Sequence, residues 1–177
     1  QRDRLVPEAL GLGWMPIFLL GYLVFLFVPV LVPSNADWGE GVRWYLWPTL
    51  LSIAVFLPMY FLAYRASAMT RVLCTLGIAA LGYGLMPFNA FSNTYVIYAA
   101  AFVALLPGSM WIRLEVFAVL IIAYCGMAAW LGFPVFVPVV TAIVSVAVFP
   151  GNYFPSETVG KRAELKLSHE EVRRLAA

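Results

Sequence analysis

The chain has 177 residues, of which 63% are hydrophobic and only 11% are charged, and its net charge is +2. This composition excludes an ordinary water-soluble domain, and the basic residues are split among short separate loops, so they form no nucleic-acid surface. Two cysteines and a single histidine provide no disulfide framework and no pair at metal-ligand spacing.

Six apolar stretches fill the sequence, and each approaches the ~20 residues that a helix needs to cross a bilayer. They are Trp14–Val32, Trp44–Ala63, Val72–Phe88, Tyr95–Ile112, Leu114–Leu131 and Val135–Pro150. The connections between them are short, which places consecutive helices side by side and antiparallel. The sequence therefore predicts an all-α integral membrane protein built as a six-span antiparallel helix bundle.

Basic residues indicate the orientation of this bundle. Ten of the eleven Lys and Arg residues fall on one side of the six-span arrangement, and only Arg43 falls on the other. Positive charge near the ends of spans is retained in the cytoplasm. We therefore predict that both termini are cytoplasmic, N-in and C-in.

Prolines and small residues predict how the helices bend and pack. Pro58 and Pro107 fall within predicted spans, where each acts either as a hinge or as a tolerated bend. Two pairs of small residues at four-residue spacing are expected to let helices approach closely. These pairs are Ala80 with Gly84 and Ala100 with Ala104.

The last predicted span carries a polar stripe. Thr141, Ser145, Asn152 and Ser156 follow one another at offsets of four, seven and four, which puts them on one helical face. Such side chains bond back to the carbonyl four residues earlier or to a neighbouring helix. The stripe is either a set of self-satisfied groups or a face that exchanges partners when bilayer thickness changes.

Ionisable residues are missing from the interior of every predicted span. Proton- and ion-coupled transporters keep such groups because they bind the coupling ion. The pattern therefore disfavours a pump or an antiporter. It also offers no set of nucleophile, base and orienting group, so we expect no catalytic residue, no cofactor site and no metal site in this segment.

A polar tail follows the last span. Leu165, Ser168, Val172 and Leu175 have the three-four-three spacing of heptad a and d positions. We expect residues 1–156 to form the membrane bundle and residues 157–177 a cytoplasmic linker helix that starts a coiled coil. Two heptads are marginal alone in water. Because the sequence begins with Gln1 and stops within this pattern, we expect it to be a piece of a longer protein.

The only histidine, His169, lies in the run Ser168-His169-Glu170-Glu171. This run superficially resembles a histidine-kinase phosphoacceptor box, in which Ser-His-Glu is followed by Leu-Arg-Thr-Pro. Here neither the Thr nor the Pro is present. We interpret His169 as a solvated residue of the linker helix.

The tail run Lys161–Ala177, KRAELKLSHEEVRRLAA, resembles the linker between the membrane bundle and the dimerisation helix of DesK-type sensor histidine kinases. The resemblance implies the membrane sensor segment of a homodimeric two-component kinase in the bacterial inner (cell) membrane. Its stimulus would be a bilayer property such as temperature-dependent thickness, or a lipophilic ligand, relayed through the coiled coil.

In that family ATP, Mg²⁺ and the response regulator engage a kinase region, which here would lie beyond Ala177. None of the family's catalytic or nucleotide-binding residues has a counterpart in this sequence, and six predicted spans differ from the five described for the founding member. A small polytopic transporter or channel subunit is the alternative from another functional class, and a generic membrane anchor is a third reading.

Overall fold

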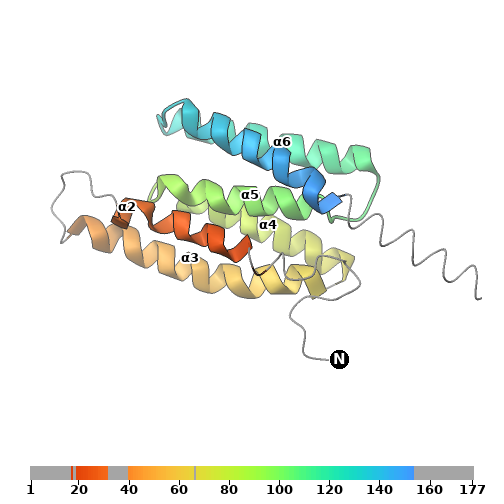
Figure 1. Cartoon of the computed structure of the whole chain (residues 1–177), viewed down its shortest axis with the longest axis horizontal. Coiled ribbons are helices and arrows are strands. Elements are labelled where there is room, and N and C mark those ends of the chain that lie inside the picture. The colour runs from red at the N-terminus through yellow and green to blue at the C-terminus, as the bar shows by residue number, and fades with distance from the viewer. Residues whose placement is uncertain (1–16, 18, 32–39, 66, 154–177) are drawn as a thin grey trace, which may run out of the picture.

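The computed structural model describes residues 17, 19–31, 40–65 and 67–153, and this part of the chain folds into helices and turns without a strand (Figure 1). The first segment consists of the 3₁₀-helix η2, Leu20–Phe27, and the short α2, Val28–Leu31. The elements that follow are α3, Glu40–Arg65; α4, Ala68–Leu85; η3, Ala90–Ser92; α5, Asn93–Val103; and α6, Met110–Trp130. After α6 comes a helix over Phe136–Tyr153, here called the 136–153 helix. The predicted all-α architecture is confirmed for these residues.

Four of the described helices are long and apolar enough to cross a membrane. They are Trp44–Arg65, Ala68–Leu85, Met110–Trp130 and Phe136–Tyr153, and they correspond to the second, third, fifth and sixth predicted spans. The first predicted span is only partly described. The fourth contains α5, whose 11 residues extend for ~17 Å against the ~30 Å of a hydrocarbon core. The count of six spans therefore stays a prediction.

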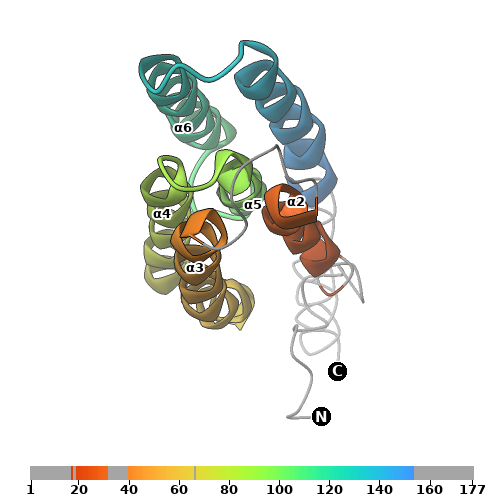
Figure 2. The same ribbon diagram turned by 90° about the vertical axis from the view of Figure 1, so that its left-hand side faces the viewer.

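Helix α5 occupies the middle of the bundle. Viewed along the helices, it is surrounded by α3, α4, α6, the first segment and the 136–153 helix (Figure 2). Nine of its eleven residues are buried, so a helix too short to span a bilayer is screened from lipid by its neighbours. The run Ala99–Ala101 lies within this buried part, and small side chains let neighbouring backbones come close.

Aromatic side chains join α3 to α5. The ring of Phe56 lies 5.0 Å from that of Tyr95 and 4.9 Å from that of Tyr98, between centroids. Further along the same interface Tyr60 and Tyr64 meet Phe102 edge to face, at 5.4 and 5.0 Å. Such pairs contribute ~0.5–1.5 kcal/mol each beyond the area that they bury. The interface between α3 and α5 is therefore tightly specified.

Helices α4 and α5 approach each other closely at Gly82. A Cβ atom built there would lie 2.8 Å from Val96 Cγ2 and 3.3 Å from the Val96 backbone nitrogen. The predicted small pair Ala100 and Ala104 is fully buried. The prediction that Ala80 and Gly84 let helices approach closely was wrong for the described bundle. Both residues are exposed, and a Cβ on Gly84 would meet nothing within 4 Å.

The fourth predicted span, Tyr95–Ile112, was expected to continue past the point where the helix ends in the structure. Helix α5 stops at Val103, turns follow, and α6 begins at Met110 behind Ser109, whose Oγ accepts a hydrogen bond from the backbone of Ile112. Pro107 and Gly108 (φ 115°) occupy this connection and break the helix instead of bending it. The connection is itself apolar, and its first residues, Ala104–Leu106, are buried. Hydropathy alone therefore hides the break.

The connection between the third and fourth predicted spans, Asn89–Thr94, is folded into the bundle. These residues form η3 and the first turn of α5, and Asn89, Ser92 and Thr94 are buried. The Oδ1 atom of Asn89 accepts a hydrogen bond of 2.9 Å from the backbone of Phe91, which caps η3. The tip between α4 and α5 is thus part of the core.

Two arginines satisfy helix carbonyls at the end of the bundle where α5 stops. Arg71 donates from Nε to the carbonyl of Ala63 and from Nη1 to that of Leu105, both at 3.0 Å. Arg113, predicted to separate two spans, lies in the first turn of α6 and donates to the carbonyl of Ala104 at 3.0 Å. Cations are favourable at helix C-termini because the last carbonyls lack intrahelical partners.

Candidate functional site

The polar stripe of the 136–153 helix faces into the bundle. Thr141 and Ser145 are fully buried and Asn152 is 2% exposed, whereas Ile143 and Val146 lie on the exposed face. In Figure 1 this helix, in blue, runs back alongside α6. The predicted stripe is therefore a packing face of the described bundle.

Hydrogen bonds of both predicted kinds occur along this face. The hydroxyl of Thr141 donates to the carbonyl of Val137 at 2.8 Å and accepts from Nδ2 of Asn93, on α5, at 2.9 Å. Asn152 bonds back to the carbonyl of Val148 at 3.3 Å. Among the stripe residues that the structure describes, Thr141 alone bonds to another helix through its side chain.

Ser145 differs from its neighbours in the stripe, because its buried Oγ has no hydrogen-bond partner among the described residues. Leaving a buried hydroxyl unpaired costs ~1–3 kcal/mol. In the middle of the stripe, the unpaired hydroxyl of Ser145 therefore reduces the stability of the observed packing. A small rotation of the helix that gave Ser145 an acceptor would recover part of that cost.

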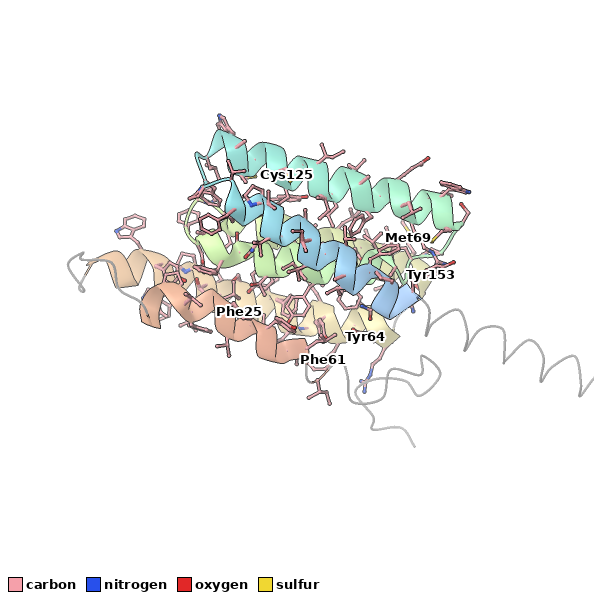
Figure 3. All side chains as sticks on the ribbon, turned by 45° about the horizontal axis from the view of Figure 1, so that its top comes forward. Phe25, Phe61, Tyr64, Met69, Cys125 and Tyr153 are labelled. Atoms are coloured by element: carbon pink, nitrogen blue, oxygen red, sulfur yellow. The ribbon has the colours of Figure 1, made fainter. Side chains whose placement is uncertain are left out.

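The end of the 136–153 helix is held by aromatic contacts and by Arg113. Phe149 lies edge to face with Phe117 of α6 at 5.1 Å and stacks on Tyr153 at 6.3 Å. The guanidinium of Arg113 lies 5.4 Å from the Tyr153 ring centroid, within range for a cation–π contact. Figure 3 shows Tyr153 at the end of the bundle where Met69 also lies. Arg113 therefore joins the end of α5 to the last described turn of the chain.

A cavity of about 280 Å³ lies between the first segment, α5 with the preceding η3, and the 136–153 helix. Its walls are mostly apolar, with polar groups only from asparagine, threonine and tyrosine. The lining residues are Leu19, Tyr22, Phe25, Phe91, Asn93, Thr94, Ile97, Tyr98, Ala101, Val140, Val144 and Val148. Figure 3 labels Phe25, which marks the side formed by the first segment. This cavity was not predictable from the sequence, because it depends on how separate elements pack against one another.

A buried polar network holds the first segment at the carbonyl of Leu26, which does not line the cavity. Pro29 has no N–H, so one donor is missing for the carbonyl of Leu26 three residues earlier. That carbonyl instead accepts hydrogen bonds from the hydroxyl of Tyr45 and from Nδ2 of Asn89, the latter at 3.1 Å. The same Nδ2 lies 3.2 Å from Thr49 Oγ1. Pro29 was the sequence signal for this network, since a proline in an apolar helix leaves a carbonyl that another element must satisfy.

The N-terminal end of the first segment, at Leu19 directly before η2, is also held by a side-chain hydrogen bond to its backbone. The hydroxyl of Tyr98, on α5, donates to the carbonyl of Leu19. Tyr98 also lines the cavity, so the residue that fixes the first segment to α5 forms part of the cavity wall.

The remaining predicted site residues lie outside the part of the chain that the structure describes. These are Ser156, Leu165, Ser168, Val172 and Leu175, together with His169. Within the described ranges no group of three or more His, Cys, Asp or Glu residues comes together to hold a metal. Cys74 is buried and Cys125 half-buried, and both are free thiols. Among the described residues, the polar groups that come together are hydroxyls, amides and backbone carbonyls that bond to one another.

Comparison with known protein families, with curated proteins and with solved structures gives no match for this chain.

Proposed function

We propose that the chain is the membrane-embedded sensor and signal-transmission segment of a bacterial two-component histidine kinase of the DesK type. The observation that carries the proposal is the position of the 136–153 helix. This helix precedes the charged tail in the sequence, packs a polar face against the bundle and lines the apolar cavity. A change in the cavity or in the surrounding bilayer therefore acts on the described element nearest to the tail.

The energies of this helix suit a switch between two packings. Hydrogen bonds between helices in membranes contribute ~0.6 kcal/mol on average, and Thr141 supplies one such bond while Ser145 supplies none. Hydrophobic mismatch costs fractions of a kcal/mol per Å. Because the mismatch energy of one helix is this small, several helices in a dimer would have to sum their responses to bilayer thickness in order to shift the population between two packings.

In this proposal the end of the bundle that carries Arg65, Arg71 and Arg113 faces the cytoplasm. The protein crosses the bacterial inner (cell) membrane several times, and a homodimer brings two tails together as a coiled coil. ATP, Mg²⁺ and the response regulator then act on a kinase region beyond Ala177.

Cysteine labelling in intact cells tests the orientation. In a background where Cys74 and Cys125 are replaced by serine, we expect Phe88→Cys, at the half-exposed tip between α4 and α5, to react with an impermeant maleimide from outside. We expect Ala68→Cys, at the start of α4, to react only after the cells are opened. Labelling of Ala68→Cys in intact cells would contradict the orientation.

Phosphorylation in defined bilayers tests the kinase function. The protein that carries this chain is reconstituted with ATP and Mg²⁺ in bilayers of shorter or longer lipids. We expect phosphohistidine to form at a rate that depends on bilayer thickness. If no bilayer supports histidine phosphorylation, the kinase assignment is wrong. If the rate is the same in all of them, sensing of thickness is wrong.

The transporter or channel alternative requires a polar path across the bundle. The cavity instead has predominantly apolar walls, and its asparagine already donates to Thr141. The described geometry therefore favours the sensor over a conducting pathway.

A further inference from the structure

We propose that the cavity between the first segment, α5 and the 136–153 helix binds one acyl chain of a membrane lipid. This inference names the ligand class of the site described above and rests on the proposed function only for its effect on signalling. Binding itself does not require that the chain belong to a kinase.

The three walls of the cavity are stripes that run parallel to the helices. Val140, Val144 and Val148 follow one another at four-residue spacing, as do Asn93, Ile97 and Ala101. In an α-helix such positions lie on one face. Each stripe covers eight residues of rise, or ~12 Å. The cavity is thus an elongated slot.

The wall from the first segment has the same length for a different reason. Leu19, Tyr22 and Phe25 are three residues apart, and in a 3₁₀-helix side chains at this spacing stand one above another. At ~2.0 Å per residue these positions also span ~12 Å. The 3₁₀ form of η2, which begins directly after Leu19, therefore places Tyr22 and Phe25 in line with Leu19 along the slot.

The dimensions of the slot fit a single lipid tail. One leaflet contributes about half of the ~30 Å hydrocarbon core, so a slot of ~12 Å covers most of the depth of one leaflet. Asn93 and Thr94 lie at one end of the α5 wall, and Ala101 lies at the other. A chain that has its ester end near the asparagine and its methyl end near the alanine matches this polarity.

The slot is accessible from the lipid phase. Tyr22, Phe25 and Val140 line it, and each is about half exposed in the described structure. These residues belong to the first segment and to the 136–153 helix, so a tail enters between these two elements. In a membrane the molecules that meet such an opening are lipids. An occupant of this shape touches both elements and thereby sets the distance between them.

Photolabelling tests this proposal directly. The 177-residue chain is reconstituted in nanodiscs of phosphatidylglycerol and phosphatidylethanolamine with a trace of phosphatidylethanolamine that carries a diazirine at mid-chain. After irradiation, labelled residues are identified by mass spectrometry. Because the competing environment of the tail is other lipid, the preference comes from packing alone, and we expect labelling of Ile97 and Val144 to exceed that of Ile122 on α6 by about threefold.

Filling the slot provides a matched pair of variants. Val144→Phe places a ring in the slot and is expected to remove the labelling excess. Ile143→Phe makes a similar change on the neighbouring, exposed position and is expected to preserve it. Val140→Phe, at a half-exposed lining position, gives a second test if Val144→Phe does not fold.

Three outcomes would overturn the proposal. The first is equal labelling of slot residues and of Ile122, which means ordinary boundary lipid only. The second is an excess that persists in both filling variants. The third is an excess seen with a diazirine-bearing free fatty acid but not with the phospholipid, which assigns the slot to a different ligand. None of these readouts uses ATP, so failure here is distinct from failure of the kinase assignment.

Discussion

Helices α5 and α6 are both strongly apolar, yet they have opposite roles in the bundle. Nine of the eleven residues of α5 are buried, whereas only Tyr124 and Ala128 are buried among the 21 residues of α6. Helix α5 is rich in alanine and tyrosine, which pack and hydrogen-bond inside protein. Helix α6 exposes large aliphatic side chains such as Val119 and Ile122. In a membrane protein, hydrophobicity therefore does not separate a core helix from a lipid-facing helix, but side-chain size and the presence of hydroxyls do.

This comparison divides the bundle into a tightly packed half and a loosely packed pair. The tight half consists of the first segment, α3, α4 and α5, which all contribute residues to one buried apolar cluster. The loose pair consists of α6 and the 136–153 helix. We expect equivalent substitutions to cost more in the tight half than in the loose pair.

The largest expected effect is at the close contact between α4 and α5. Gly82→Leu forces a side chain into the space occupied by Val96, including its backbone nitrogen, and we expect a loss of about 3 kcal/mol or more in unfolding free energy. Gly126→Leu on α6, where a Cβ meets nothing within 4 Å, is the control and should change stability by less than about 1 kcal/mol. Denaturant unfolding in detergent measures both. Equal losses would remove the distinction between the two halves.

The next effect compares two buried asparagines. Asn89→Leu removes bonds to Leu26, Thr49 and Phe91, and three bonds at the ~0.6 kcal/mol typical of membrane helices predict a loss of about 2 kcal/mol. Asn152→Leu removes one bond to its own helix and should cost no more than about 0.6 kcal/mol. The same unfolding assay applies. A larger loss of unfolding free energy for Asn152→Leu than for Asn89→Leu would mean that the polar contacts of the loose pair contribute more to stability, contrary to this prediction.

Removal of Arg113 should loosen one end of the 136–153 helix. Arg113→Gln deletes the cation–π contact with Tyr153, worth ~0.5–2 kcal/mol depending on desolvation. We expect hydrogen exchange to accelerate about tenfold at residues 149–153 and to change little in α3. Uniform acceleration in both regions would mean that the two halves open together.

The smallest effect distinguishes two hydroxyls of the stripe. Thr141→Val removes the bond to Asn93 and should cost about 0.6 kcal/mol. Ser145→Ala removes a buried hydroxyl without a described partner and should leave stability unchanged or slightly raised. Thermal unfolding of the two variants beside the parent chain is sufficient. A clear loss at Ser145 would show that its hydroxyl has a partner in the bilayer.

Much of the architecture followed from the sequence, because spans of about 20 apolar residues have few alternatives in a membrane. The helices matching the second, third, fifth and sixth predicted spans were predictable from hydropathy, and the common face of Thr141 and Ser145 was predictable from the helical period. The inward direction of that face is a finding of the structure. The end of α5 was missed, because hydropathy continues through Ala104–Leu106, although the dipeptide Pro107-Gly108 was a local signal for a break.

The cavity and the network at Leu26 were not predictable for a related reason. Each depends on atoms from at least three elements that are far apart in sequence, such as Leu26, Tyr45 and Asn89. A single sequence reports local period and composition, and it contains no direct record of which helices meet. Conversely, Ser145 was correctly placed on the stripe, but its lack of a partner depends on the neighbours of the 136–153 helix.

The carbonyl of Leu26 also bears on the order of assembly during membrane insertion. Its observed side-chain donors are Tyr45, on α3, and Asn89, which follows it by 63 positions. A polar group is costly to leave unpaired in hydrocarbon, and this carbonyl has its full set of side-chain donors only when both Tyr45 and Asn89 have folded into place. The first segment therefore completes its hydrogen bonds late, after the tip between α4 and α5 has formed.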